Sequence, residues 1–71
     1  MKEQLSEREI TIIRLTAQGL TGKEIGRFLG IDPSTVKNHM TRIFKKLSVH
    51  NRAQVMVYAA RQGLLESRVQ S

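Results

Sequence analysis

The segment spanning residues 21–47 carries the start and stop signals of two helices separated by a tight turn. Thr21 and Glu24 form a capping box, in which the hydroxyl accepts from the Glu24 backbone N–H and the carboxylate reaches back. Gly30 supplies the left-handed position that ends a helix. Asp32 then begins the next helix as its N-cap, and a proline follows at the first helical position. The sequence therefore predicts a short helix, a turn and a second helix that runs to the end of the segment.

The second of these helices is predicted to have two different faces. Helical spacing places five apolar side chains on one side: Val36, Met40, Ile43, Phe44 and Leu47. Polar and cationic side chains occupy the rest of its surface: Ser34, Lys37, Asn38, Thr41, Arg42 and Lys45. A short helix that braces a longer one with a basic, amide-bearing free face is the geometry that enters a DNA major groove. The segment thus predicts a protein that reads DNA.

The distribution of charge along the sequence also indicates a DNA-binding protein. The formal net charge is +6, and no acidic residue occurs between Asp32 and Glu66. Six basic residues fall in that interval: Lys37, Arg42, Lys45, Lys46, Arg52 and Arg61. A stretch of one sign favours a polyanion, because each neutralised phosphate releases condensed counterions. A membrane surface is a poorer partner, since the apolar face of the basic helix is needed for the core.

Composition excludes several other classes of protein. The chain of 71 residues has no cysteine, and its two histidines lack the partner spacing of a zinc site. No apolar run approaches the roughly 18 residues of a membrane span, and no signal-peptide pattern opens the chain. Neither a nucleophile–base pair, a carboxylate dyad nor a phosphate-cradling glycine loop is present. We therefore expect no enzymatic activity, no metal, no cofactor, no small-molecule ligand and no membrane contact, with a cytoplasmic location as the default.

The region before this segment predicts another capped helix. Ser6 and Glu9 repeat the capping box, and Gly19 provides the stop. One face of this helix is expected to be buried, namely Ile12, Ile13, Thr16 and Ala17. Ile10 and Leu15 flank that face, so we expect them to be half-buried. In the following helix, Gly26 is expected where two helices cross closely.

A fourth helix is predicted to begin near Asn51 and to end before Gly63. Val55, Met56 and Ala59 account for a core-facing stripe, which leaves Val57 and Tyr58 on the outside. Exposed apolar surface on a small basic domain usually marks a partner, and self-association is the form we favour. The predicted fold class is all-α: a compact four-helix domain that contains a helix-turn-helix.

Several separated motifs resemble the LuxR-type helix-turn-helix domain. They are Leu5-Ser6-Glu7-Arg8-Glu9, Gly19-Leu20-Thr21-Gly22-Lys23-Glu24-Ile25, Thr35-Val36-Lys37-Asn38-His39, Lys46-Leu47, Asn51-Arg52 and Gly63-Leu64-Leu65. The resemblance covers residues 5–65, and residues 1–4 and 66–71 are assigned to terminal tails. It implies a DNA-binding domain of bacterial transcription regulators, commonly the output domain of response regulators. The third helix would read the major groove, and the fourth would pair two copies on an inverted repeat.

The expected site residues follow from the free face and from this resemblance. Asparagine pairs with adenine N6 and N7, and lysine donates to guanine O6 and N7. The expected base-reading residues are Ser34, Lys37, Asn38 and Thr41. The expected phosphate-binding residues are Thr21, Lys23, Thr35, His39, Arg42, Lys45 and Lys46. The expected dimer interface is Val57, Tyr58, Arg61 and Leu64.

Two alternatives remain at the level of the sequence. A module similar to region 4 of sigma factors also pairs capped helices with a helix-turn-helix, and it would bind promoter DNA through RNA polymerase. A basic protein-interaction module would instead direct its cationic face to an acidic protein. If the chain is instead a LuxR-type transcription regulator, RNA polymerase is a candidate partner in addition to DNA.

Overall fold

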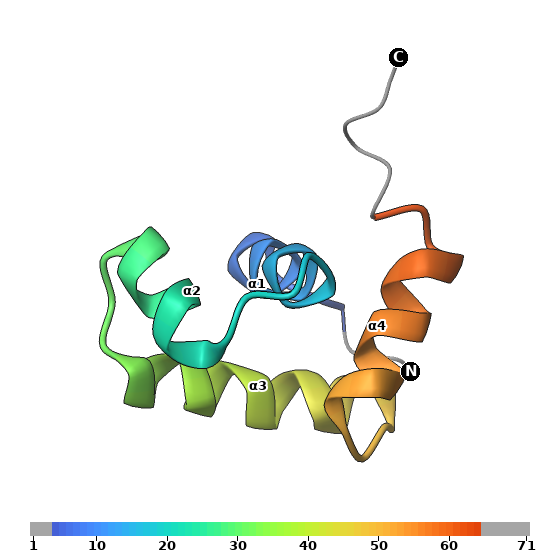
Figure 1. The fold of residues 1–71 in the computed structure, drawn as a ribbon. Coiled ribbons are helices and arrows are strands. Elements are labelled where there is room, and N and C mark those ends of the chain that lie inside the picture. Colours follow the sequence, from blue (N-terminus) through green and yellow to red (C-terminus); the bar gives the residue numbers. More distant parts are fainter. Residues whose placement is uncertain (1–3, 65–71) are drawn as a thin grey trace.

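A computed structural model describes residues 4–64 of the chain, which contain four α-helices and no strand. The helices are α1 (Glu7–Ala17), α2 (Gly22–Leu29), α3 (Pro33–Leu47) and α4 (Arg52–Arg61). In Figure 1, α3 runs along the base, α1 lies above it, and α2 and α4 stand at opposite ends. The all-α, four-helix prediction is confirmed. The predicted boundary at residue 65 and the C-terminal tail lie outside the described residues.

Side-chain caps set the start of every helix. The Glu9 backbone N–H donates to Ser6 Oγ at 3.1 Å, and the Ser6 N–H donates to Glu9 Oε1 at 2.8 Å. Thr21 and Glu24 repeat these two bonds at the start of α2. Asp32 caps α3 and Asn51 caps α4. The caps satisfy N–H groups that a helix cannot pair internally, so each helix begins where its sequence signal predicts.

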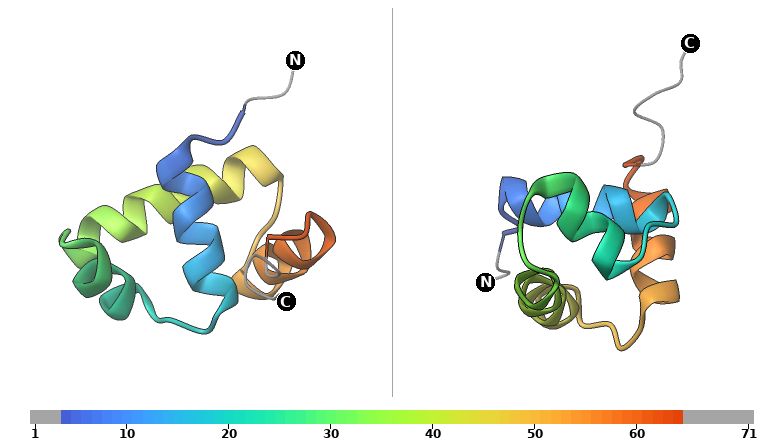
Figure 2. Two further views of the ribbon diagram at one scale, coloured as in Figure 1. Left: turned by 90° about the horizontal axis from the view of Figure 1, so that it is seen from above. Right: turned by 60° about the vertical axis from the view of Figure 1, so that its left-hand side comes forward.

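The core forms where α1 crosses over α3. Figure 2 shows this crossing from above, with α2 and α4 at the two ends of α3. The fully buried side chains come from all four helices: Ile12, Ile13, Thr16, Ile25, Val36, Ile43, Val55 and Ala59. Ala17 is half-buried and packs against this cluster. Burial of this apolar surface is the main favourable term that holds the helices together.

Several burial predictions were wrong, including that for Ala17, which was expected in the buried face of α1 and is half-buried. Leu15 was expected to be half-buried, but it is only 8% exposed, because α4 packs against α1 and covers that flank. Met56 was expected in the core, but it is 38% exposed. Helix α4 packs chiefly against the single helix α1, so only one narrow stripe of α4, Val55 and Ala59, is buried in that contact and Met56 lies outside it.

Gly26 makes the turn between α2 and α3 compact. A Cβ atom at this position would lie 2.7 Å from the Ile31 carbonyl oxygen and 3.4 Å from the Pro33 nitrogen. The close approach predicted for Gly26 is present, but its partner is the backbone of the turn rather than the side of another helix. Gly30 adopts the left-handed conformation with φ 71°, as predicted for the end of α2. The turn therefore fixes the position of α3 relative to α2.

Candidate nucleic-acid interface

The free face of α3 carries the four predicted base-reading side chains. Ser34, Lys37, Asn38 and Thr41 are all exposed. On the opposite side of the same helix, Val36 and Ile43 are buried in the core. The helix is thus held by its apolar side and presents its polar side to solvent, and the backbone positions of the four residues are fixed by the packing behind them.

Internal hydrogen bonds separate these four residues into two pairs. Ser34 Oγ donates to Asp32 Oδ1 at 2.8 Å, and Thr41 Oγ1 donates to the Lys37 carbonyl oxygen at 3.1 Å. The side chains of Lys37 and Asn38 form no hydrogen bond with any other described residue. The bonds from the Ser34 backbone N–H and hydroxyl hold the pKa of the Asp32 carboxyl below its ordinary value. Of these four residues, Lys37 and Asn38 are therefore the two whose side chains keep free donors.

The predicted phosphate-binding residues come from the start of α2 and from α3. Thr21 and Lys23 are exposed at the start of α2, and Thr35 is exposed in the first turn of α3. Arg42 and Lys45 are exposed farther along α3, whereas His39 is half-buried on its flank. The Thr21 hydroxyl accepts the capping bond from Glu24. The structure thus leaves all of these groups except the half-buried His39 exposed, at the start of α2 and along α3.

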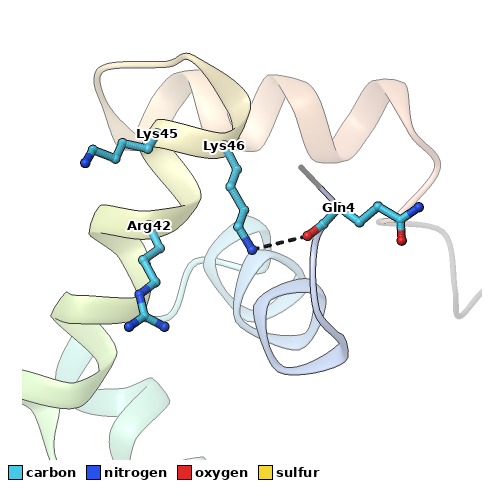
Figure 3. A pocket seen from close by; sticks show the side chains of 4 residues that line it. All are labelled: Gln4, Arg42, Lys45 and Lys46. Carbon is cyan, nitrogen blue, oxygen red and sulfur yellow. Dashed lines mark hydrogen bonds between the residues drawn. The ribbon is translucent and has the colours of Figure 1, made fainter. Parts of the chain in front are cut away.

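Lys46 differs from its neighbours because it forms an ion pair with Glu9 of α1. Its Nζ lies 2.8 Å from Glu9 Oε1 and donates to the Gln4 carbonyl oxygen at 3.2 Å (Figure 3). The side chain of Lys46 is 20% exposed and that of Glu9 is 3% exposed. Burial by itself raises the pKa of the Glu9 carboxyl, but the hydrogen bonds from Lys46 and Ser6 and the lysine charge outweigh burial and hold it below 4.5. Lys46 therefore fastens α3 to α1, and its ammonium charge is largely neutralised.

On α4, three of the four predicted interface residues share a surface. Val57, Tyr58 and Arg61 line a hollow of about 360 Å³ together with Val49, Gln54 and Gln62. Val57 is 52% exposed, and Tyr58 is half-buried rather than on the outside as expected. Leu64 follows the helix and packs against the core. The structure therefore brings Val57, Tyr58 and Arg61 together around this hollow, and Leu64 is not among the residues that line it.

Sequence reasoning missed two features of the helix ends. Arg52, the first residue of α4, donates through Nη2 to the carbonyl oxygen of Leu20, which directly precedes the cap of α2. Its partner is 32 positions away, so no local signal could reveal the contact. Phe28 is 68% exposed on α2, although it follows the buried Ile25 by three positions, a spacing that usually places two side chains on the same buried face. Within residues 4–64, no helix is long and apolar enough to cross a membrane and no acidic, histidine or cysteine group could hold a metal.

A capped helix, a tight turn and a longer helix with an exposed polar face define a helix-turn-helix DNA-binding domain. The model of the family described as GerE, bacterial regulatory proteins, luxR family, matches residues 3–59. The chain belongs to this family of transcription regulators. The resemblance drawn from the motifs is thereby confirmed, as is the prediction of a non-enzymatic protein, which rests on this membership.

Curated relatives and a solved structure agree with this assignment. The chain is 49% identical over 63 residues to the transcriptional regulatory protein LiaR of Bacillus subtilis, covering 89% of this chain and 30% of that protein. It is 39% identical over 64 residues to the response regulator protein VraR of Staphylococcus aureus, covering 90% and 31%. The crystal structure of response regulator ChrA of a heme-sensing two-component system matches with a TM-score of 0.82 and 38% identity, covering 90% of this chain and 32% of ChrA. The chain thus spans less than a third of the length of these proteins.

Proposed function

We propose that this chain binds double-stranded DNA in a sequence-specific manner as the DNA-binding part of a bacterial transcription regulator. In this proposal α3 enters the major groove, and two copies bind an inverted repeat. The observation that carries the proposal is the exposure of Lys37 and Asn38, with free donors, on a helix whose other side is buried through Val36 and Ile43. A reading helix needs both properties, because base contacts demand a fixed backbone and unengaged polar groups.

Each base-reading residue then has a chemical role. Asn38 offers the amide pair that matches adenine N6 and N7, and Lys37 offers donors for guanine O6 and N7. The Thr41 hydroxyl is turned back to the Lys37 carbonyl oxygen, so its methyl group is available for a thymine methyl. Ser34 sits at the start of α3, where its hydroxyl already bonds Asp32, and it would contact the edge of the site.

The phosphate contacts would come from both helices of the motif. Thr21 and Lys23 reach the backbone from the start of α2, while Thr35, His39, Arg42 and Lys45 do so from α3. Lys46 contributes less in this proposal, because Glu9 already neutralises its charge. Phosphate contacts set orientation and affinity without reading sequence. Binding is therefore expected to weaken steeply as salt rises.

Pairing of two copies would use the α4 surface formed by Val57, Tyr58 and Arg61. Val57 is the most exposed large apolar side chain on this helix, and it borders the hollow beside Tyr58 and Arg61. A symmetric contact through this surface would direct two α3 helices to successive half-sites. The regulator would act in the bacterial cytoplasm, where RNA polymerase is a further partner.

Selection of bound duplexes from random DNA tests the proposal, because it reports motif, symmetry and half-site spacing together. We expect an inverted repeat. Asn38→Ala should relax the preference at one position per half-site, with a loss of about 1–3 kcal/mol of discrimination there. Lys45→Ala is the matched control: it should weaken binding to all sequences alike and reduce the salt slope by about 1. Unchanged specificity in Asn38→Ala, or binding without any sequence preference, would contradict the proposed reading helix.

A further inference from the structure

Two hollows adjoin where the start of α1 meets the end of α3. One, of about 580 Å³, is lined by Gln4, Arg42, Lys45 and Lys46 (Figure 3). The other, of about 710 Å³, is lined by Gln4, Leu5, Ile10, Lys46, Leu47, Ser48 and Tyr58. Gln4 and Lys46 border both hollows, so the two form one continuous surface. We call it the junction groove.

The two ends of the junction groove differ in chemistry. At one end, here called the apolar end, Leu5, Ile10 and Leu47 are half-buried beside Tyr58, and the polar residues Gln4, Lys46 and Ser48 also border it. The other end is cationic, because Arg42 and Lys45 are exposed and pair with no carboxylate of the described residues. Figure 3 shows the Arg42, Lys45 and Lys46 side chains extending in different directions from the last turns of α3. Lys46 lies between the two ends and is already neutralised by Glu9.

A DNA duplex lying on α3 does not account for the apolar end. Leu47 follows the buried residues Val36 and Ile43 along α3, on the side opposite Asn38. Phosphates could approach Arg42 and Lys45, but a duplex on the free face offers nothing that would fill the space beside Leu47 and Ile10. A second copy of this chain is a poor occupant of the cationic end, because it has twelve lysines and arginines against only six acidic residues to pair with Arg42 and Lys45.

We propose that the junction groove binds an acidic peptide segment of a partner protein, with one large apolar side chain flanked by carboxylates. The apolar side chain would lie between Ile10, Leu47 and Tyr58. The neighbouring carboxylates would pair with Arg42 and Lys45, and arginine suits this role because its guanidinium binds a carboxylate through two parallel hydrogen bonds. An acidic segment without an apolar side chain would contact only the cationic end of the groove. An apolar segment without charge would contact only the apolar end.

Peptide binding to the junction groove does not require the proposed sequence-specific DNA binding. It would, however, change the affinity of the chain for DNA. Arg42 and Lys45 border the junction groove and are also expected to contact phosphates. An acidic peptide in the groove would therefore compete with DNA for these two cations and reduce DNA affinity without touching Lys37 or Asn38. The surface would give a partner protein a means of lowering DNA binding.

Titration of a ¹⁵N-labelled chain with synthetic peptides tests the proposal. The probe is a short peptide with a central Leu-Phe pair between glutamates, and two matched peptides replace either the pair by alanines or the glutamates by glutamines. We expect saturable shifts of the Leu5, Ile10 and Leu47 amides with the probe. Each matched peptide should bind at least about tenfold more weakly, since each lacks one half of the contacts.

Substitutions then locate the binding. Lys45→Gln should weaken the probe several-fold, whereas the matched Lys37→Gln, the same charge change outside the groove, should leave its affinity within twofold. Ile10→Asp should abolish binding of the probe in a variant that retains its helical circular dichroism and its DNA affinity. Equal binding of the alanine peptide, equal effects of the two lysine variants, or shifts confined to the free face of α3 would each overturn the proposal. None of these results bears on sequence-specific DNA binding, which is measured separately.

Discussion

Replacement of Lys46 by methionine is expected to destabilise the domain strongly. The substitution retains most of the apolar stem and removes the ammonium group that lies 2.8 Å from Glu9 Oε1. The Glu9 carboxylate, only 3% exposed, would then keep the Ser6 N–H bond but lose its cationic partner. A buried charge without a partner is one of the few mechanisms by which a single substitution causes a large loss of stability.

The burial of the two partners sets the size of this effect. Loss of one partner lowers stability by about 3–5 kcal/mol for a fully buried ion pair, and an exposed pair contributes only about 0–1 kcal/mol. Because Lys46 remains 20% exposed, we expect an intermediate loss of about 2–3 kcal/mol. A domain of 71 residues has a total stability of only about 4–10 kcal/mol. The melting temperature should therefore fall by about 10–20 °C.

Urea and thermal unfolding at neutral pH measure the loss, and Lys45→Met is the matched control. Lys45 is the exposed neighbour on the same helix and forms no ion pair within the described part of the chain, so its loss should change stability by less than about 0.5 kcal/mol. The double variant Glu9→Gln with Lys46→Met should recover part of the loss, because no uncompensated charge remains. Equal losses of stability in Lys46→Met and Lys45→Met would show that the buried Glu9 carboxylate does not depend on its pair with Lys46.

The pH dependence of the same pair has a definite sign. The pKa of Glu9 is lower in the folded chain than its ordinary value of 4.5, so the pair stabilises the fold fully above about pH 4.5. This contribution is lost as the pH falls through the folded pKa of Glu9. The stability difference between the parent chain and Lys46→Met should accordingly shrink below pH 4.5. A difference that stays constant across this range would contradict the assignment to Glu9.

Three further substitutions test other parts of the structure. Gly26→Ala should lower the midpoint of urea unfolding, with a net loss of about 1 kcal/mol, because its Cβ would meet the Ile31 carbonyl oxygen at 2.7 Å and this outweighs the gain in helix propensity. Ser48→Gly should raise the melting temperature, with a gain of about 0.5–1 kcal/mol, because Ser48 ends α3 in the left-handed region with φ 56°. Val57→Glu should weaken self-association in sedimentation and cooperative binding to an inverted repeat, whereas Phe28→Glu, at a still more exposed apolar site on α2, should not. Unaltered sedimentation of Val57→Glu would place the dimer surface elsewhere.

The boundaries of the helices were predictable because their signals are local. Ser6, Thr21, Asp32 and Asn51 each bond a backbone N–H within three positions, so the residues that start each helix are neighbours in the sequence. The left-handed Gly30 is local in the same way. The two faces of α3 also followed from its helical period, since one long helix with a continuous apolar side leaves little ambiguity about the face that is buried.

The relations between helices were less accessible to sequence reasoning. Met56 and Val55 are adjacent and similar in character, and only the crossing of α4 on α1 decides that Val55 is buried and Met56 is not. Glu9 was recognised as a cap, but its ion pair with Lys46 joins positions 37 apart and depends on how α3 packs against α1. Lys46 was grouped with the phosphate-binding residues for the same reason: its charge is visible in the sequence and its partner is not. The roles of the base-reading residues stay predictions.

The contact between Arg52 and the Leu20 carbonyl oxygen bears on how much variation in operator spacing two paired copies could tolerate. It joins the first residue of α4 to the backbone just before α2, across the domain. If two copies pair through α4, this contact limits the rotation of each reading unit relative to the pairing surface. The distance between half-sites would then be set by the domain itself. A regulator built in this way would bind repeats of one spacing well and would lose affinity sharply when a single base pair is inserted between them.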